Sequence, residues 1–134
     1  MTMRRIVALA TAAAGTVGFI GTAAAPSYAA KAPGSRLVLT VAAGEKAKPV
    51  QQRATLTCGP AGGTHKQAKA ACAALNAAKG DPAAIKNDGS MCMMIYDPVT
   101  VTATGNWRNK PVRYTHTYGN PCVLKASTGA VFAF

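Results

Sequence analysis

Acid–base catalysis in this chain would fall to four Asp and Glu side chains and two His side chains. Two carboxylates that share the roles of proton donor and proton acceptor must lie close together. The four carboxylates are Glu45, Asp81, Asp88 and Asp97, and they fall in four separate predicted loops or element ends. Neither His65 nor His116 has a neighbour suited to binding a metal, so we expect each to be an ordinary surface or capping histidine. The sequence also lacks a G-x-S-x-G nucleophile elbow, so we expect no enzyme, no catalytic residue, no metal and no cofactor.

Residues 90–97 read S-M-C-M-M-I-Y-D and hold three of the five methionines of the chain within four positions. The apolar and sulfur-containing members of this segment are Met91, Cys92, Met93, Met94, Ile95 and Tyr96. The apolar run favours a buried strand. Turn-forming residues close to both ends of the run, and a strand pattern that begins only after Pro98, favour an exposed loop instead. An exposed apolar loop that is tied down through Cys92 would mark a binding site.

Residues 106–114, N-W-R-N-K-P-V-R-Y, place two aromatic residues among three cationic residues. Aromatic stacking beside positive charge is how proteins hold single-stranded nucleic acids. The simpler interpretation, which we favour, is a hairpin tip with an aromatic anchor and the solvated face of a strand. In an exported protein an anionic wall polymer would be a better partner than nucleic acid, so we expect no nucleic acid partner. A cationic envelope-binding protein that uses Trp107, Arg108 and Arg113 is the alternative function.

The first 29 residues have the layout of a secretory signal peptide. Arg4 and Arg5 supply positive charge, and residues 6–25 form an Ala-rich apolar run. The small residues Ser27 and Ala29 follow, and we expect cleavage after Ala29. The alternative is a membrane anchor, because the run approaches the roughly 20 residues that span a bilayer. Its weak hydrophobicity and its small-residue end favour cleavage. We therefore expect residues 30–134 to form a secreted, extracellular domain with no membrane contact after cleavage.

Residues 30–134 suffice for one domain with one modest hydrophobic core. The full chain has 15 Lys and Arg against 4 Asp and Glu, and the loss of Arg4 and Arg5 leaves 13 against 4, a formal charge of +9. Such a charge suggests affinity for anionic surfaces or acidic partners. The lysines are scattered along the chain, however, so a solvated basic surface is the simpler interpretation.

Four cysteines, an even number in a small exported domain, indicate two disulfides and no free thiol for catalysis. The residues alone allow three pairings. The sequential pairing, Cys58 with Cys72 and Cys92 with Cys122, would close two moderate loops, each contributing roughly 3 to 4 kcal/mol in the chain-entropy treatment. A metal site would need closely spaced pairs such as C-x2-C, and the sequence contains none.

Hydrophobic periodicity predicts the elements that must position these groups. The expected strands cover residues 36–42, 51–57, 99–104, 110–118 and 129–134, with a loop at 59–63, a turn at 105–109 and a break at 119–121. The first expected helix is capped by Thr64 and runs to about Lys79, with Gly80 as its stop. A short second helix over residues 81–87 has Asp81 as its cap and Pro82 as its first residue. This order predicts an α+β fold, with an antiparallel sheet and the helices on one face.

Five short motifs carry a resemblance to a known family. M-C-M-M-I-Y-D-P-V at residues 91–99, together with L-V-L-T-V, T-L-T-C, G-T-H and the terminal V-F-A-F, resembles the Streptomyces subtilisin inhibitor family of secreted serine-protease inhibitors. The similarity covers essentially the whole chain after the signal peptide, in order. It implies an antiparallel sheet of about five strands with two helices, the sequential disulfides Cys58–Cys72 and Cys92–Cys122, and a homodimer formed through the sheets.

The resemblance also implies a reactive-site loop that a protease binds like a substrate. Carried onto this sequence, the loop consists of Met91, Cys92, Met93, Met94, Ile95 and Tyr96, and the scissile bond is Met94–Ile95. The implied partner is a secreted subtilisin-like serine protease, and chymotrypsin-like enzymes, which also have an apolar specificity pocket, are a second target class. The loop would be tied by the Cys92–Cys122 bridge, and Asn120 would lie beneath it and hydrogen-bond its backbone. The same scaffold directed at a metalloprotease or a transglutaminase partner is an alternative.

Two positions depart from the family's usual pattern. The family's loop usually reads Met-Cys-Pro-Met-Val-Tyr-Asp-Pro, and Met93 here stands where proline is usual. This change removes a fixed φ angle, so we expect a looser loop and an effect on potency rather than on mechanism. The first cysteine loop is about one residue shorter, at a place away from the binding loop.

Overall fold

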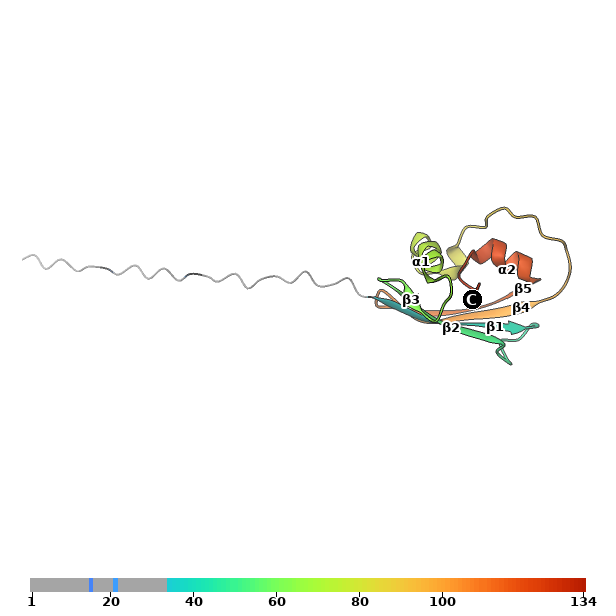
Figure 1. Ribbon diagram of the computed structural model, residues 1–134, viewed down its shortest axis with the longest axis horizontal. Coiled ribbons are helices and arrows are strands. Elements are labelled where there is room, and N and C mark those ends of the chain that lie inside the picture. The colour runs from blue at the N-terminus through green and yellow to red at the C-terminus, as the bar shows by residue number, and fades with distance from the viewer. Residues whose placement is uncertain (1–14, 16–20, 22–33) are drawn as a thin grey trace, which may run out of the picture. The chain divides into compact units, whose positions relative to one another are not determined.

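Figure 1 shows the computed structural model of the chain, in which residues 15, 21 and 34–134 are described. The predicted signal peptide, residues 1–29, and the predicted start of the domain at residue 30 lie outside the described residues, apart from two isolated glycines. Both therefore stay predictions. Neither of the α-helices found among the described residues has the length and hydropathy of a membrane span.

A five-stranded antiparallel sheet forms one layer of the domain. Its strands are β1 (Ser35–Ala43), β2 (Gln52–Cys58), β3 (Gly62–Gly63), β4 (Val99–Trp107) and β5 (Lys110–Tyr118), in the spatial order β3-β2-β1-β4-β5. The four long strands are those that the alternation of apolar residues predicts. Leu39 of β1 pairs with Ala54 of β2 and with Ala103 of β4, so apolar residues from three strands share one face.

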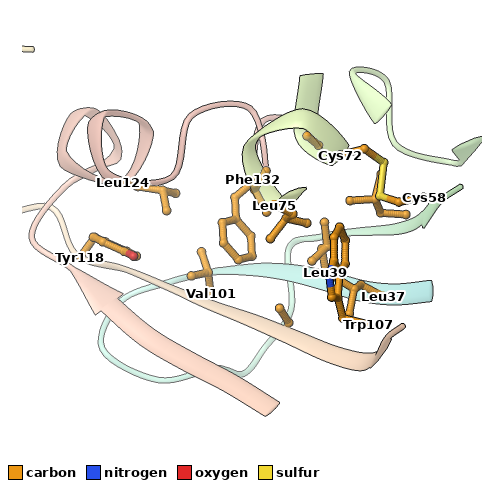
Figure 2. Packing of buried hydrophobic residues seen from close by; sticks show 14 residues of the cluster. Leu37, Leu39, Cys58, Cys72, Leu75, Val101, Trp107, Tyr118, Leu124 and Phe132 are labelled. Carbon is orange, nitrogen blue, oxygen red and sulfur yellow. A yellow bond between two sulfur atoms is a disulfide. The ribbon is translucent and has the colours of Figure 1, made fainter. Parts of the chain in front are cut away.

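Two α-helices, α1 (Ala68–Ala77) and α2 (Pro121–Thr128), and one 3₁₀ turn, η1 (Pro82–Ala84), complete the domain. Figure 1 shows α1 and α2 on the same side of the sheet. The core lies between these layers (Figure 2), where Leu39 and Val101 from the sheet meet Leu75 from α1 and Leu124 from α2. The α+β fold with a five-stranded antiparallel sheet, two helices and two disulfides is confirmed.

The predicted loop at 59–63 contains the short strand β3, which the sequence pattern does not predict. Gly62 and Gly63 pair with the end of β2 as β3. A Cβ atom at Gly63 would lie 2.2 Å from the carbonyl oxygen of Thr55, and the φ angle of Gly63 is +94°. Only glycine fits this close pairing, so a run that is typical of a loop serves here as a strand.

The prediction that Thr64 caps the first helix is wrong. Its Oγ1 accepts a hydrogen bond from the Thr55 amide at 2.9 Å, which engages Thr64 with β2 instead. Helix α1 begins only at Ala68, and Gln67 before it makes no side-chain cap. The side chain that prepares the helix start is His65, whose Nδ1 accepts from the Gln67 amide at 2.9 Å.

The second helix lies elsewhere in the chain than the sequence pattern indicates. Residues 81–87 hold only η1, although the Asp81 carboxylate caps it as predicted by accepting from the Ala83 amide at 2.9 Å. The predicted break at 119–121 is instead the start of α2. There the Asn120 side chain accepts from the Val123 amide at 2.9 Å, and Pro121 occupies the first helical position.

The predicted last strand, residues 129–134, is wrong, because this segment belongs to none of the strands in the described part of the chain. Val131 and Phe132 are buried in the core without strand pairing. His65 is buried beside them, and its Nε2 donates to the Val131 carbonyl at 2.9 Å. With Nδ1 already accepting, the two bonds together require the Nε2–H tautomer. The surface location expected for His65 is therefore wrong, and the capping alternative fits.

Candidate functional site

The methionine segment is an exposed loop between η1 and β4, so the buried-strand interpretation is wrong. Figure 1 shows the chain arching away from α2 before it enters β4. The exposed fractions of its large side chains are 98% for Met91, 76% for Met93, 97% for Met94, 59% for Ile95 and 70% for Tyr96. Apolar side chains exposed to this degree, side by side, are typical of a binding surface.

A disulfide ties the loop to helix α2. Cys92 bonds to Cys122, the second residue of α2, with 5.7 Å between the two Cα atoms. The other disulfide, Cys58–Cys72, joins β2 to α1 inside the core and lies away from the loop. Both bonds follow the sequential pairing, and the described part of the chain has no free cysteine. The loop is thus anchored two residues before Met94.

The buried side chain of Asn120 supports the loop from beneath. Its Nδ2 donates to the carbonyl oxygen of Met93 at 3.1 Å and to that of Ile95 at 2.9 Å. These two carbonyls belong to the peptide groups on either side of the Met94–Ile95 bond. Because Oδ1 also accepts from the Val123 amide, one side chain caps α2 and holds the loop at once.

Backbone hydrogen bonds fix the end of the loop that leads into β4. The amide of Asp97 donates to the Gly119 carbonyl at 2.9 Å, and the amide of Gly44 donates to the Pro98 carbonyl at 2.7 Å. Gly44 lies in the β1–β2 connection, and its own carbonyl accepts from Thr100 Oγ1 at 2.8 Å. The β1–β2 connection therefore braces the loop, a role that no sequence motif indicates.

Side-chain turns fix the other end of the loop. The Asn87 side chain accepts from the Gly89 amide and the Asp88 side chain accepts from the Ser90 amide, both at 2.8 Å. The hydrogen bonds from the side chain and backbone of Ser90 lower the pKa of Asp88 below its ordinary value. The Asp88 amide donates in turn to the Ala126 carbonyl of α2 at 2.9 Å. Both ends of the loop and its middle are therefore fixed to the body of the domain.

A hollow of about 390 Å³ separates the loop from the start of α2. It is lined by Met91, Met93, Ile95, Asp97, Asn120, Pro121 and Cys122. Alternate loop residues thus border the hollow, whereas Met94 is not among its lining residues and is almost fully exposed. Met91 and Met94 are both almost fully exposed, and of these two only Met91 borders the hollow.

Glu45 makes a contact with the loop that no sequence motif indicated. The hydroxyl of Tyr96 donates to the Glu45 carboxylate, and this hydrogen bond raises the pKa of Tyr96 above its ordinary value. The two residues are 51 positions apart in the sequence, and their proximity arises because the β1–β2 connection lies beside the start of β4. The contact fixes the Tyr96 side chain, which lies on the C-terminal side of the Met94–Ile95 bond.

Replacing Glu45 by alanine is expected to return the pKa of Tyr96 toward its ordinary value of 10.0, because the hydrogen-bonded carboxylate is the main cause of the shift. Since the folded pKa is raised, the contact stabilises the protein below the ordinary tyrosine pKa and is lost as the pH rises through the raised value. An NMR titration of the Tyr96 ring measures this. Glu45→Gln, which keeps an acceptor but removes the charge, is the control, and an unchanged Tyr96 titration in Glu45→Ala would contradict the contact.

The four carboxylates that could have served catalysis have other roles. Asp81 caps η1, Asp88 closes a turn, and Glu45 holds Tyr96. Asp97 borders the hollow under the loop. Among the described residues, no group of three or more His, Cys, Asp and Glu is arranged to hold a metal ion. Three of the four carboxylates therefore make structural contacts.

The basic and aromatic segment at 106–114 is a hairpin tip whose aromatic residue is an anchor. Trp107 is buried, with only 3% of its surface exposed, so it is not available to stack on a ligand. Arg108 covers the Trp107 ring at 5.7 Å from its centroid and donates to the Asn76 side chain at 3.0 Å. The alternative function that relies on Trp107, Arg108 and Arg113 therefore loses its aromatic contact.

Comparison with known proteins identifies the family. Residues 33–120 match the sequence profile of the family described as subtilisin inhibitor-like. Subtilisin inhibitor-like protein 5 of Streptomyces fradiae is 48% identical over 102 residues, which cover 73% of this chain and 95% of that protein. The subtilase-type protease inhibitor of the same organism is 47% identical over 130 residues, covering 93% of this chain and 89% of its own length. The transglutaminase-activating metalloprotease inhibitor of Streptomyces mobaraensis is 46% identical over 105 residues, covering 75% and 71% respectively.

A solved structure extends the similarity to three dimensions. It is the crystal structure of Streptomyces caespitosus sermetstatin in complex with Bacillus licheniformis subtilisin, with a TM-score of 0.63 and 38% identity. The match covers 76% of this chain and 100% of the matched chain. The relatives are named as inhibitors and not as enzymes. Its profile match and its identity to these relatives show that the chain belongs to the subtilisin inhibitor-like family.

Proposed function

We propose that this protein inhibits subtilisin-like serine proteases, and chymotrypsin-like enzymes as a second class, by offering Met94–Ile95 as a substrate bond. The observation that carries this proposal is the pair of hydrogen bonds from Asn120, which bracket that bond by holding the Met93 and Ile95 carbonyls. The similarity to an inhibitor solved in complex with subtilisin supports the target class.

Met94 suits an apolar specificity pocket. Its side chain is long, unbranched and 97% exposed, so it can enter a partner's pocket without prior rearrangement of the domain. Apolar primary pockets are found in chymotrypsin-like enzymes, whereas the pocket of trypsin carries an aspartate. Met91 and Met93 would extend along the cleft on one side of Met94, and Ile95 and Tyr96 on the other.

Inhibition rather than digestion follows from the way the loop is held. The Cys92–Cys122 bond and Asn120 anchor the chain before the Met94–Ile95 bond, and Asn120 and the Tyr96–Glu45 contact anchor it after that bond. After cleavage the two new ends would stay in place, poised to rejoin. A preformed loop also loses little conformational entropy on docking, so an interface of roughly 1,600 Å² can become very tight.

Asn120→Ala is expected to inhibit only temporarily. Cleavage at Met94–Ile95 should be faster than in the wild type by roughly tenfold or more, because two hydrogen bonds near 1 kcal/mol each are lost. The helix cap would be lost as well. Asn120→Asp separates the two roles, since its carboxylate can still accept from the Val123 amide but cannot donate to the loop. We expect the same fast cleavage in Asn120→Asp, measured as recovery of protease activity with time. Persistent inhibition by both variants would show that Asn120 does not support the loop.

The proposed function is tested by titrating a fixed, active-site-calibrated amount of subtilisin with the purified protein. We expect activity to fall linearly to zero near a one-to-one ratio of inhibitor to enzyme. Chymotrypsin in a parallel titration tests the second target class. Undiminished subtilisin activity, with the chain digested at many bonds, would refute the proposal.

The proposal includes secretion of the protein after removal of residues 1–29, and a dimer formed through the sheet. The helices cover one face of the sheet (Figure 1), and the other face carries Val38, the hydrogen-bonded pair Thr40 and Thr102, and Thr55. We propose that a second copy of the chain covers this face. Sedimentation equilibrium is expected to give a dimer for the wild type and a monomer for Val38→Lys, and a wild-type monomer at all concentrations would contradict the dimer.

The Streptomyces mobaraensis relative favours one further candidate function, because its name describes an inhibitor of a transglutaminase-activating metalloprotease. Inhibition of a secreted metalloprotease by this chain is therefore worth measuring beside subtilisin. If Met94→Asp still inhibited the metalloprotease but not subtilisin, the two targets would use different contacts on this scaffold.

A further inference from the structure

The methionines of the described domain are confined to the loop. Met91, Met93 and Met94 are the only methionines among residues 34–134. The hydrophobic core is built from Leu, Val, Ala, Cys, Trp, Tyr and Phe and contains no methionine among the described residues. Flexible thioethers, which elsewhere fill gaps in cores, are thus concentrated where this domain would meet its target.

The cysteines and the tryptophan of the described residues, which peroxides also oxidise, are protected. All four cysteines are in disulfides, and the indole of Trp107 is buried. The thioether sulfurs, in contrast, belong to side chains that are 76% to 98% exposed. Susceptibility to oxidation follows exposure, so a peroxide should react with the three loop methionines before any other group.

We propose that reversible oxidation of the Met94 side chain switches off inhibition. The inference rests on the proposed function, since it assigns to Met94 the contact with the specificity pocket. In the reaction, the Met94 sulfur attacks one oxygen of hydrogen peroxide and gives up two electrons. An S–O bond forms and the O–O bond breaks. The departing hydroxide takes the proton from the oxygen now bonded to sulfur, so the products are methionine sulfoxide and water.

The sulfoxide changes the fit of residue 94 while leaving its size almost unchanged. The new S–O dipole is a strong hydrogen-bond acceptor, and an apolar pocket offers it no donor. Binding would leave this acceptor desolvated and unpaired, which corresponds to roughly a 10- to 100-fold rise in the inhibition constant. Methionine sulfoxide reductases return the thioether, so the loss is reversible.

The three methionines are not equivalent. Met91 and Met93 border the hollow between the loop and α2, whereas Met94 does not. Oxidation of the first two should therefore weaken inhibition less than oxidation of Met94. None of the three side chains is part of the core, so the melting temperature of the domain should stay unchanged after oxidation.

The experiment treats the purified protein with hydrogen peroxide, locates sulfoxides by peptide mass spectrometry, and titrates subtilisin before and after treatment. Two variants are treated in parallel. Met94→Leu keeps an apolar, long side chain but cannot be oxidised, and the double variant Met91→Leu, Met93→Leu leaves Met94 as the sole thioether of the loop. A thermal melt of each sample reports folding.

We expect the treated wild type and the treated double variant to lose inhibition by roughly 10- to 100-fold, and to recover it with methionine sulfoxide reductase. Treated Met94→Leu should inhibit as well as untreated Met94→Leu. The inference is overturned if wild type with its Met94 fully oxidised inhibits normally, or if treated Met94→Leu loses inhibition equally. Failure of the untreated proteins to inhibit at all would instead refute the proposed function.

Discussion

Replacing Met94 by lysine is expected to turn the protein from an inhibitor of subtilisin-like proteases into an inhibitor of trypsin-like ones. The almost fully exposed side chain at position 94 would fill the primary pocket, and the pocket of trypsin offers a buried aspartate as the partner of a lysine. Close charge pairs across interfaces are coupled by about 1.5–7 kcal/mol, so the inhibition constant for trypsin should fall by roughly tenfold or more. Parallel titrations of trypsin and subtilisin measure the gain of trypsin inhibition and the loss of subtilisin inhibition.

Two companion substitutions make the result specific to the pocket. Met94→Asp would bury an unpaired carboxylate in an apolar pocket, and inhibition of subtilisin should fall by roughly 100-fold or more. Met94→Leu keeps the apolar character and should change inhibition of subtilisin little. If the lysine and aspartate variants both inhibited subtilisin normally, residue 94 would not be the primary contact and the loop assignment would be wrong.

Removal of the Cys92–Cys122 bond is expected to convert the inhibitor into a substrate. Without this bond, the segment before Met94 would keep the hydrogen bond from Asn120 to the Met93 carbonyl but lose its covalent tether, so a cleaved chain could leave the enzyme. We expect the double variant Cys92→Ala, Cys122→Ala to be cut at Met94–Ile95 and to release active subtilisin within the assay, whereas the wild type stays bound.

The second disulfide supplies a matched control. Removing Cys58–Cys72 should lower the free energy of unfolding by about 3 kcal/mol or more, an amount similar to that for Cys92–Cys122 in the chain-entropy treatment. That bond lies in the core and makes no contact with the loop. At a temperature where both double variants are folded, we expect only the loop variant to be cut quickly. Equal cleavage of the two would mean that general stability, and not the tether, prevents digestion.

The sequence was sufficient for the parts of the fold that rest on local alternation. Leu37 and Leu39 in β1, and Val101 and Ala103 in β4, are spaced by two and are all buried. The same reasoning failed for Val131 and Phe132. Their apolar run is buried beside His65 in the core, and burial without strand pairing leaves the same local pattern as a strand.

Other features depend on contacts between distant residues. Gly62 and Gly63 form a strand against β2, whose Thr55 lies so close to Gly63 that only glycine fits there. Thr64 bonds to β2 instead of capping α1. The contact of Glu45 with Tyr96 links segments that share no motif. Asn120 is different, because its place before Pro121 carries the local signal of a helix cap. Its additional contacts with the loop were expected only from the family resemblance.

N-terminal sequencing of the protein after incubation with a stoichiometric amount of subtilisin identifies the bond that the protease cuts. We propose that this bond is Met94–Ile95, and we therefore expect one new N-terminus, at Ile95, in a complex that still inhibits the enzyme. A single new N-terminus at any other residue, or an inhibitory complex that persists when Met94 is replaced by aspartate, would contradict it.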